Sequence, residues 1–81
     1  MRHDPFTHVV RVPLDRSRPE SHGGILAKLR ASEMTFGRWK LDPYYRAAAK
    51  GFSEVRCYAA DASPIAMEIE GLPERINADG A

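Results

Sequence analysis

The sequence predicts a small α+β domain in which an N-terminal strand joins a C-terminal hairpin in a small antiparallel sheet, with two helices packed on one face. Three observations carry this prediction. Residues 7–14 are rich in Val and Thr, as strands are. Residues 42–51 begin and end with helix-capping signals, and residues 53–71 contain two runs in which apolar residues alternate with polar ones.

The C-terminal hairpin is the element whose register follows from the pattern. Its two runs flank a five-residue connection, residues 60–64, which is an ordinary hairpin length. Because opposite residues of an antiparallel pair share a face, one register places all six apolar residues on the same side. The pairs are Val55 with Ile69, Cys57 with Met67, and Ala59 with Ile65. This register also sets Arg56 opposite Glu68 on the other face.

The N-terminal strand is predicted over residues 7–14, THVVRVPL. Its even-numbered residues, from His8 to Leu14, would share one face. Pro13 cannot donate a ladder hydrogen bond, so the strand should end near it or lie at a sheet edge. A polar loop is predicted over residues 15–24, followed by a short helix over residues 25–33.

The helix at residues 42–51 has the clearest local signals. Asp42 is a good N-cap, Pro43 fits the first helical position, and Gly51 can end the helix. The predicted apolar stripe consists of Tyr45, Ala48, Ala49 and Phe52. The preceding segment, residues 34–41, favours a short strand with a basic exposed side, and the alternative is a turn or a half-helix that sets Phe36 and Trp39 into the core.

Length and composition favour one small domain, residues 1–81, with residues 1–6 and 73–81 as flexible tails. The 81 residues are 43% hydrophobic and 28% charged, a composition that argues against disorder. No apolar run approaches the roughly 20 residues that cross a bilayer, and the N-terminus lacks the apolar region of a secretory signal. The predicted location is therefore cytoplasmic. The single cysteine, Cys57, is expected to act as a small core residue.

Charge is unevenly distributed along the chain although the net charge is only +1. Residues 1–52 hold ten basic against five acidic side chains, whereas residues 53–81 hold two against six. Such a split suggests a bipolar surface that would suit an acidic partner on one side and a basic partner, or a second copy in a homo-oligomer formed through the opposite-charge halves, on the other. The alternative is that both halves are simply solvated.

The residues that could carry catalysis or bind a metal do not form a known pattern. The three histidines, His3, His8 and His22, match no structural zinc spacing with Cys57, and no nucleophile has a nearby base and orienting acid in the sequence. The sequence therefore predicts no catalytic residue, no metal site and no cofactor, and it does not favour an enzyme.

A polar loop before the first helix is a candidate anion site, because helix N-termini and glycine backbones attract anions. The candidate residues are Arg16, Arg18, Ser21, His22, Gly23 and Gly24. The stretch lacks the motif of a P-loop or of a dinucleotide fold. The favoured alternative is an ordinary helix entry with Ser21 as the N-cap.

A second cluster interleaves basic and aromatic residues and is the candidate partner-binding surface. Its members are Arg38, Trp39, Lys40, Tyr44, Arg46 and Lys50. Trp, Tyr and Arg are the residue types that dominate protein interfaces, and basic residues with aromatics also suit nucleic acids. The alternative is that Trp39 and one tyrosine belong to the core while the basic residues are solvated.

The first functional hypothesis is a non-enzymatic protein-interaction module, such as an accessory subunit or a small regulator or inhibitor of a larger protein. The second is a nucleic-acid-binding regulator, either sheet-based or winged-helix-like with residues 55–69 as the wing. The near-zero net charge argues against the second. A weaker third hypothesis is an anion or phosphate-ligand binder that uses the loop at residues 16–24.

Overall fold

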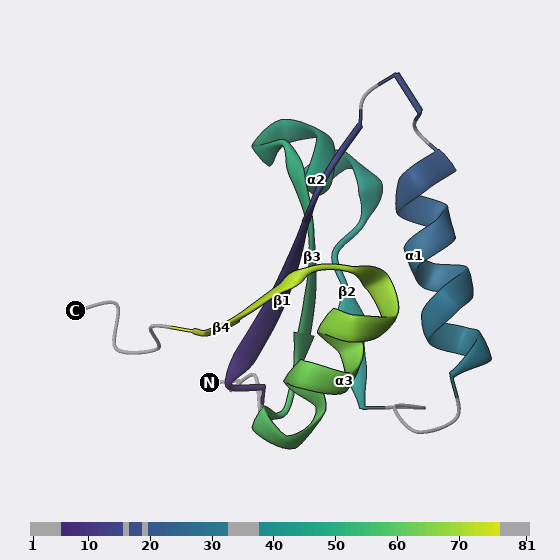
Figure 1. Ribbon diagram of the computed structural model, residues 1–81. Coiled ribbons are helices and arrows are strands. Elements are labelled where there is room, and N and C mark those ends of the chain that lie inside the picture. Colours follow the sequence, from purple (N-terminus) through teal and green to yellow (C-terminus); the bar gives the residue numbers. More distant parts are fainter. Residues whose placement is uncertain (1–5, 16, 19, 33–37, 77–81) are drawn as a thin grey trace.

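The computed structural model describes residues 6–15, 17–18, 20–32 and 38–76, and these ranges form four strands and three helices (Figure 1). Their order is β1 (His8–Pro13), α1 (Glu20–Ala31), β2 (Trp39–Leu41), α2 (Tyr44–Lys50), β3 (Phe52–Cys57), α3 (Ala59–Ile69) and β4 (Leu72–Arg75). The strands form one antiparallel sheet in the order β2-β3-β1-β4. Helices α1 and α3 pack on one face of the sheet. The predicted α+β class is confirmed.

The topology contains two interlocked crossovers. Strand β3 lies antiparallel between β1 and β2, so β1 and β2 run parallel and α1 connects them. In the same way β1 lies between β3 and β4, which α3 connects. With the short helix α2 placed between β2 and β3, this is the split β-α-β arrangement that is also called ferredoxin-like.

The core lies between the sheet and the two covering helices. Val10 of β1 stands opposite Val55 of β3, and both are fully buried. Leu29 of α1 and Ile65 of α3 pack against the same cluster and are also fully buried. The predicted common face of β1 is therefore confirmed for Val10, and Val12 packs against the edge of the cluster.

The predicted hairpin over residues 53–71 is wrong in its second half. Residues 53–57 lie in strand β3 as expected, and β3 also includes Phe52 of the predicted helical stripe, but residues 59–69 form helix α3. The apolar residues Ala62, Ile65, Ala66 and Ile69 recur with the helical period and are all buried, whereas Met67 is 82% exposed. Cys57 is buried as expected, but it stands opposite His8 and Trp39 rather than Met67. The winged-helix hypothesis required a hairpin over residues 55–69, and this hairpin does not form.

Helix α2 is shorter than predicted and its N-terminus differs. Pro43 is its N-cap residue, and the carboxylate of Asp42 forms ion pairs with Lys50 and Arg56 instead of capping. Gly51 ends the helix as predicted, with φ 91° and its N–H donating to the carbonyl of Ala47 at 2.8 Å. Ala47 is the buried residue of α2, so the predicted stripe that contained Tyr45 is wrong.

Helix α1 begins five residues earlier than predicted, at Glu20. Residues 20–24 are therefore helical rather than part of a loop, and the predicted glycine-rich entry turn is wrong. Ile25 and Leu29 are buried as expected, and His22 is buried with them. Together α1 and α3 cover the face of the sheet that the predicted helices over residues 25–33 and 42–51 were expected to cover.

The two outer strands are short. In β2, Trp39 and Leu41 pack against the core while Lys40 is exposed, as the alternation predicted; residues 34–37 lie outside the described ranges. Residues 72–75 form β4, so the tail predicted over residues 73–81 is wrong for its first part. Residues 77–81 and 1–5 lie outside the described ranges. Phe6, in the predicted N-terminal tail, packs edge-on against Tyr58 with ring centroids 5.0 Å apart.

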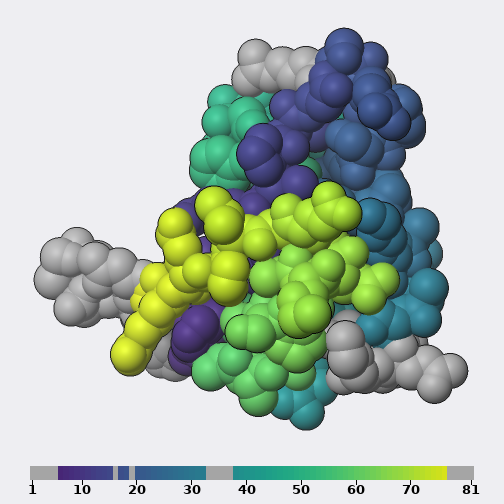
Figure 2. All heavy atoms as spheres, in the orientation of Figure 1, coloured from purple at the N-terminus to yellow at the C-terminus, as the bar shows by residue number. Residues whose placement is uncertain are grey.

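The turn between α3 and β4 needs a glycine for close packing. A Cβ at Gly71 would lie 2.6 Å from Cγ1 of Val10 and 2.9 Å from the carbonyl oxygen of Arg11. Because Gly71 has no side chain, β4 can follow α3 directly and lie beside β1. The space-filling view shows α3 and β4 as one continuous surface next to α1 (Figure 2).

Candidate binding surface

The face of the sheet opposite α1 and α3 is lined by charged side chains. Odd-numbered residues of β1 and even-numbered residues of β2, β3 and β4 share this face, because cross-strand partners point the same way. The charged residues on it are Lys40, Arg56, Glu54, Arg11 and Glu74. We call this the open face.

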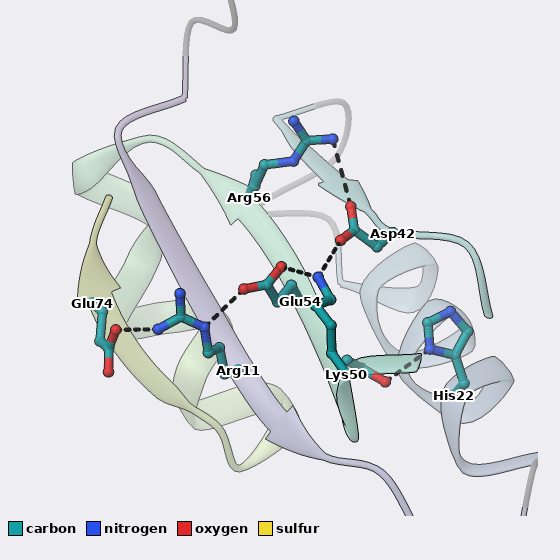
Figure 3. Close-up of polar contacts among 8 residues, drawn as sticks. Arg11, His22, Asp42, Lys50, Glu54, Arg56 and Glu74 are labelled. Carbon is teal, nitrogen blue, oxygen red and sulfur yellow. Dashed lines mark hydrogen bonds and ion pairs between the residues drawn. The ribbon is translucent and has the colours of Figure 1, made fainter. Parts of the chain in front are cut away.

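A chain of ion pairs crosses the open face from β4 to β2 (Figure 3). Arg11 of β1 pairs with Glu74 on one side and donates from Nε to Glu54 Oε2 at 2.8 Å on the other. Lys50, at the end of α2, continues the chain by contacting both Glu54 and Asp42, with its Nζ 3.0 Å from Asp42 Oδ2. Asp42 in turn lies 3.6 Å from Nη2 of Arg56. Within this series of ion pairs, Glu54 and Asp42 each contact two cations, whereas Glu74 contacts one.

The ion pairs shift the protonation of the central carboxylate. Burial opposes ionisation of Glu54, but hydrogen bonds from Lys50 and Arg11 outweigh it and lower its pKa below the ordinary value of 4.5. The same two cations lie over the ring of Phe52, at 5.4 and 5.5 Å from its centroid. This half of the open face is therefore occupied by its own side chains.

At the β2 end the open face contains a shallow depression of about 200 Å³, which we call the basic depression. It is lined by Lys40, Leu41, Asp42, Pro43, Tyr45, Arg46 and Arg56. Lys40 and Arg46 form no ion pair among the residues that the structure describes, and Tyr45 beside them is 70% exposed. With Asp42 as its one carboxylate, the basic depression has an excess of positive charge.

The four basic residues of the predicted partner-binding cluster are divided between three places. Lys40 and Arg46 meet in the basic depression, and Lys50 belongs to the ion-pair chain. On the other side of the sheet, Arg38 donates from Nε to Asp61 Oδ2 at 2.9 Å and lies over the ring of Tyr58.

The two aromatic members of the predicted cluster are elsewhere. Trp39 packs against the core, as one alternative anticipated. Tyr44 packs edge-on against His22, with the two ring centroids 5.8 Å apart. The depression gains instead Tyr45 and Arg56, which the sequence reasoning did not assign to a site. For Arg56 a signal was present, because it alternates with the buried Val55 and Cys57.

The predicted anion site does not form as a loop. Arg18 lies 3.7 Å from Glu20, and Ser21, His22, Gly23 and Gly24 are part of α1. Arg16 lies outside the described ranges. Arg18, Ser21 and Gly24 do line a pocket of about 400 Å³, but its two cations, Arg18 and Lys28, are offset by two acids, Asp15 and Glu70.

The uneven charge of the sequence is partly compensated inside the chain. Cations of the N-terminal part pair with acids of the C-terminal part, as Arg11 does with Glu74 and Arg38 does with Asp61. These contacts use charges that the sequence alone left available for a partner. Lys40 and Arg46 stand apart from this pattern.

The described residues give little support for a nucleophilic catalytic site or for a metal site. Nδ1 of His22 is 2.8 Å from Oγ of Ser53, but Ser53 is only 1% exposed and the pair has no acid beside it among the contacts of the described residues. Within residues 6–15, 17–18, 20–32 and 38–76, no group of three or more His, Cys, Asp or Glu side chains is arranged to hold a metal ion. None of the three described helices has the length and apolar character needed to span a membrane.

Comparison of the chain with models of known protein families, with curated proteins and with solved structures gave no match.

Proposed function

We propose that this protein is a non-enzymatic interaction module that docks an acidic segment of a protein partner in the basic depression. The observation that carries the proposal is the pair Lys40 and Arg46, which are exposed, flank the exposed ring of Tyr45, and have no ion-pair partner in the described part of the chain. Acidic groups of a partner would complete the charge balance that Asp42 leaves incomplete. Complementary charge of this kind favours specific and rapid association.

A nucleic acid is the alternative occupant of the open face. Four-stranded sheets of this topology bind single strands through aromatic side chains that stack on bases. Here the sheet aromatic, Phe52, is flanked by Arg11 and Lys50, and Glu54 and Glu74 place negative charge on the same face. The two cations lie over the ring of Phe52, so the ring offers no free platform for a base, and the two carboxylates oppose a phosphate backbone that crosses the open face. A short acidic protein segment in the basic depression avoids both obstacles.

Fluorescence anisotropy with three labelled probes tests the proposal: a ten-residue peptide that alternates Glu with Thr and Val, a matched peptide with Lys in place of Glu, and random single-stranded RNA. We expect the Glu peptide to bind at low salt and the Lys peptide not to bind. The double variant K40E/R46E should weaken binding of the Glu peptide roughly tenfold, chiefly through the association rate. The double variant K28E/R30E, at two exposed positions of α1, makes the same change in net charge, so it is the matched control and should leave binding unchanged.

Two outcomes would contradict the proposal. Equal binding of the Glu and Lys peptides would mean that charge does not select the partner. RNA binding that falls steeply with salt, without binding of the Glu peptide, would instead support a nucleic-acid binder, because phosphate contacts release counterions. A thermal melt of each variant confirms that it is folded, since exposed charges alter stability by under about 0.5 kcal/mol.

A further inference from the structure

The two outer edges of the sheet differ in the backbone groups that they present. Directly after β4, the N–H of Ile76 donates to the carbonyl of Thr7 at 2.9 Å, so Ile76 and Thr7 form a hydrogen-bonded pair that continues the ladder. Such pairs alternate along an antiparallel ladder, so Glu74 is the next residue whose backbone bonds to β1. The backbone groups of Pro73 and Arg75 therefore point away from the sheet. Pro73 has no N–H to offer, so the outer edge of β4 is blocked at its centre.

No residue that the structure describes blocks the outer edge of β2. The N–H of Asp42 donates to the carbonyl of Glu54 at 3.1 Å, so Lys40, two residues earlier, is the next residue bonded to β3. The N–H and C=O groups of Trp39 and Leu41 therefore point away from the sheet. Neither residue has a further hydrogen bond within the described ranges. Two donors and two acceptors are thus available to an added strand.

The side chains of β2 set the chemistry that such a strand would need. Lys40 points to the open face, next to the basic depression, whereas Trp39 and Leu41 point to the core face and are only half-buried. Residues of an added strand would alternate in the same way, since cross-strand neighbours share a face. Acidic residues would lie beside Lys40, and apolar residues would cover Trp39 and Leu41.

A second copy of this chain fits the edge poorly. If β2 paired with β2 of another copy about a two-fold axis, Trp39 would pair with Leu41 and each Lys40 would lie directly opposite the other Lys40. Like charges in directly opposed positions are destabilising. Strand β4 of a second copy would present Pro73, which lacks the N–H that the edge of β2 would accept.

We propose that the outer edge of β2 accepts an extended segment of a partner protein in which acidic and apolar residues alternate, so that the segment becomes a fifth strand of the sheet. This inference rests on the proposed function and specifies its geometry. Backbone hydrogen bonds from Trp39 and Leu41 hold the segment, and Lys40 and Arg46 select its acidic residues.

Amide hydrogen exchange, followed by NMR on the ¹⁵N-labelled protein, tests the inference. In the free protein the amide of Lys40 should be protected, whereas those of Trp39 and Leu41 should exchange rapidly. Adding the alternating Glu peptide should slow exchange at Trp39 and Leu41 by tenfold or more. The outward amide of Arg75, on the other edge, is the internal control and should not change. A peptide of the same composition, with its Glu residues in one block, should give no protection.

A backbone modification gives a second readout that keeps every side chain. Chemical ligation between Arg56 and Cys57 would allow the protein to be assembled with an N-methyl group on the amide of Leu41. Because this amide makes no bond to β3, the fold should persist while peptide affinity falls about tenfold.

The outcomes separate this inference from the proposed function. If the Glu peptide binds and K40E/R46E weakens it, but Trp39 and Leu41 remain unprotected, docking occurs at side chains alone and strand addition is overturned. If no peptide binds even at low salt, the proposed function fails and the strand addition fails with it.

Discussion

Helices α1 and α3 cover the same face of the sheet but are held there in different ways. Of the eleven residues of α3, five are buried, against three of the twelve in α1. Helix α3 packs on β1 and β4, whereas the main contacts of α1 are with α3 itself. Helix α1 also carries Gly23 and Gly24 at exposed positions. The comparison indicates that the core is organised under α3, and that α1 depends on α3 for its place.

The largest effect should follow from a cavity under α3. Ile65 is fully buried between α3 and the sheet, so Ile65→Ala should lower the free energy of unfolding by about 2–5 kcal/mol. Urea denaturation of the two proteins measures this difference. A loss below about 1 kcal/mol would mean that α3 is not the centre of the core.

The pH dependence of stability should depend on the same packing, because α3 covers the thiol of Cys57 in β3. Cys57 lies in the core next to α3; burial, with a smaller contribution from Asp61, raises the pKa of its thiol from 9.0 to about 11. Between these two pH values the unfolded chain has lost this proton and the folded chain has kept it. Stability should therefore fall as pH rises from about 9 to 11, by at most about 2–3 kcal/mol.

Urea denaturation across this pH range checks the prediction, with Cys57→Ala as the control. The variant loses stability at every pH but should lack the part of the decline that belongs to the thiol. Identical pH profiles for the two proteins would show that the thiol is not shielded by α3.

In α1 a substitution should raise stability. Gly23 is exposed, lies inside the helix, and has nothing within 4 Å of the place that a Cβ would occupy. Gly23→Ala should therefore stabilise the protein by about 0.5–1 kcal/mol, because alanine favours the helix and restricts the unfolded chain. A thermal melt would detect the change, and a lower melting temperature would argue that α1 does not begin at Glu20.

The smallest effect should come from the outer side of α3. Met67 is 82% exposed, so Met67→Ala should change stability by less than about 0.5 kcal/mol. Comparing the stability losses of Met67→Ala and Ile65→Ala distinguishes the helix from the hairpin predicted for the same residues. In the hairpin register both residues would be buried and both substitutions would be costly.

Local sequence signals predicted where some elements end, because proline and glycine act on the backbone at their own positions. The Val-rich strand ends at Pro13 and helix α2 ends at Gly51, as predicted, although α2 begins later than predicted and buries Ala47 instead of the predicted stripe. The error at α3 has a definable cause: Ile65 and Ile69 are four residues apart, a spacing that suits a strand and a helix equally. Met67 completes a period-2 alternation with Ile65 and Ile69, which favours a strand. The residues that complete the helical stripe, Ala62 and Ala66, are small and give a weaker hydrophobic signal.

The candidate surface could be predicted only in part for a related reason. Lys40 and Arg46 stood out because they are basic residues near aromatics. Arg56 joins them through the pairing of β2 with β3, a long-range register that the sequence did not reveal. Asp42 had a local role available as a helix cap, yet the ion pairs with Lys50 and Arg56 engage its side chain instead.

Pro73 has a consequence for how far any assembly could grow. Edge-to-edge polymerisation of a sheet needs an accepting edge on both sides of every subunit, so that each added copy offers a new template. Here the centre of one edge lacks the required N–H. A strand added at β2 would thus complete a particle of fixed stoichiometry rather than start an open-ended fibre. Replacing Pro73 would remove the barrier that keeps this small sheet from becoming a repeating unit.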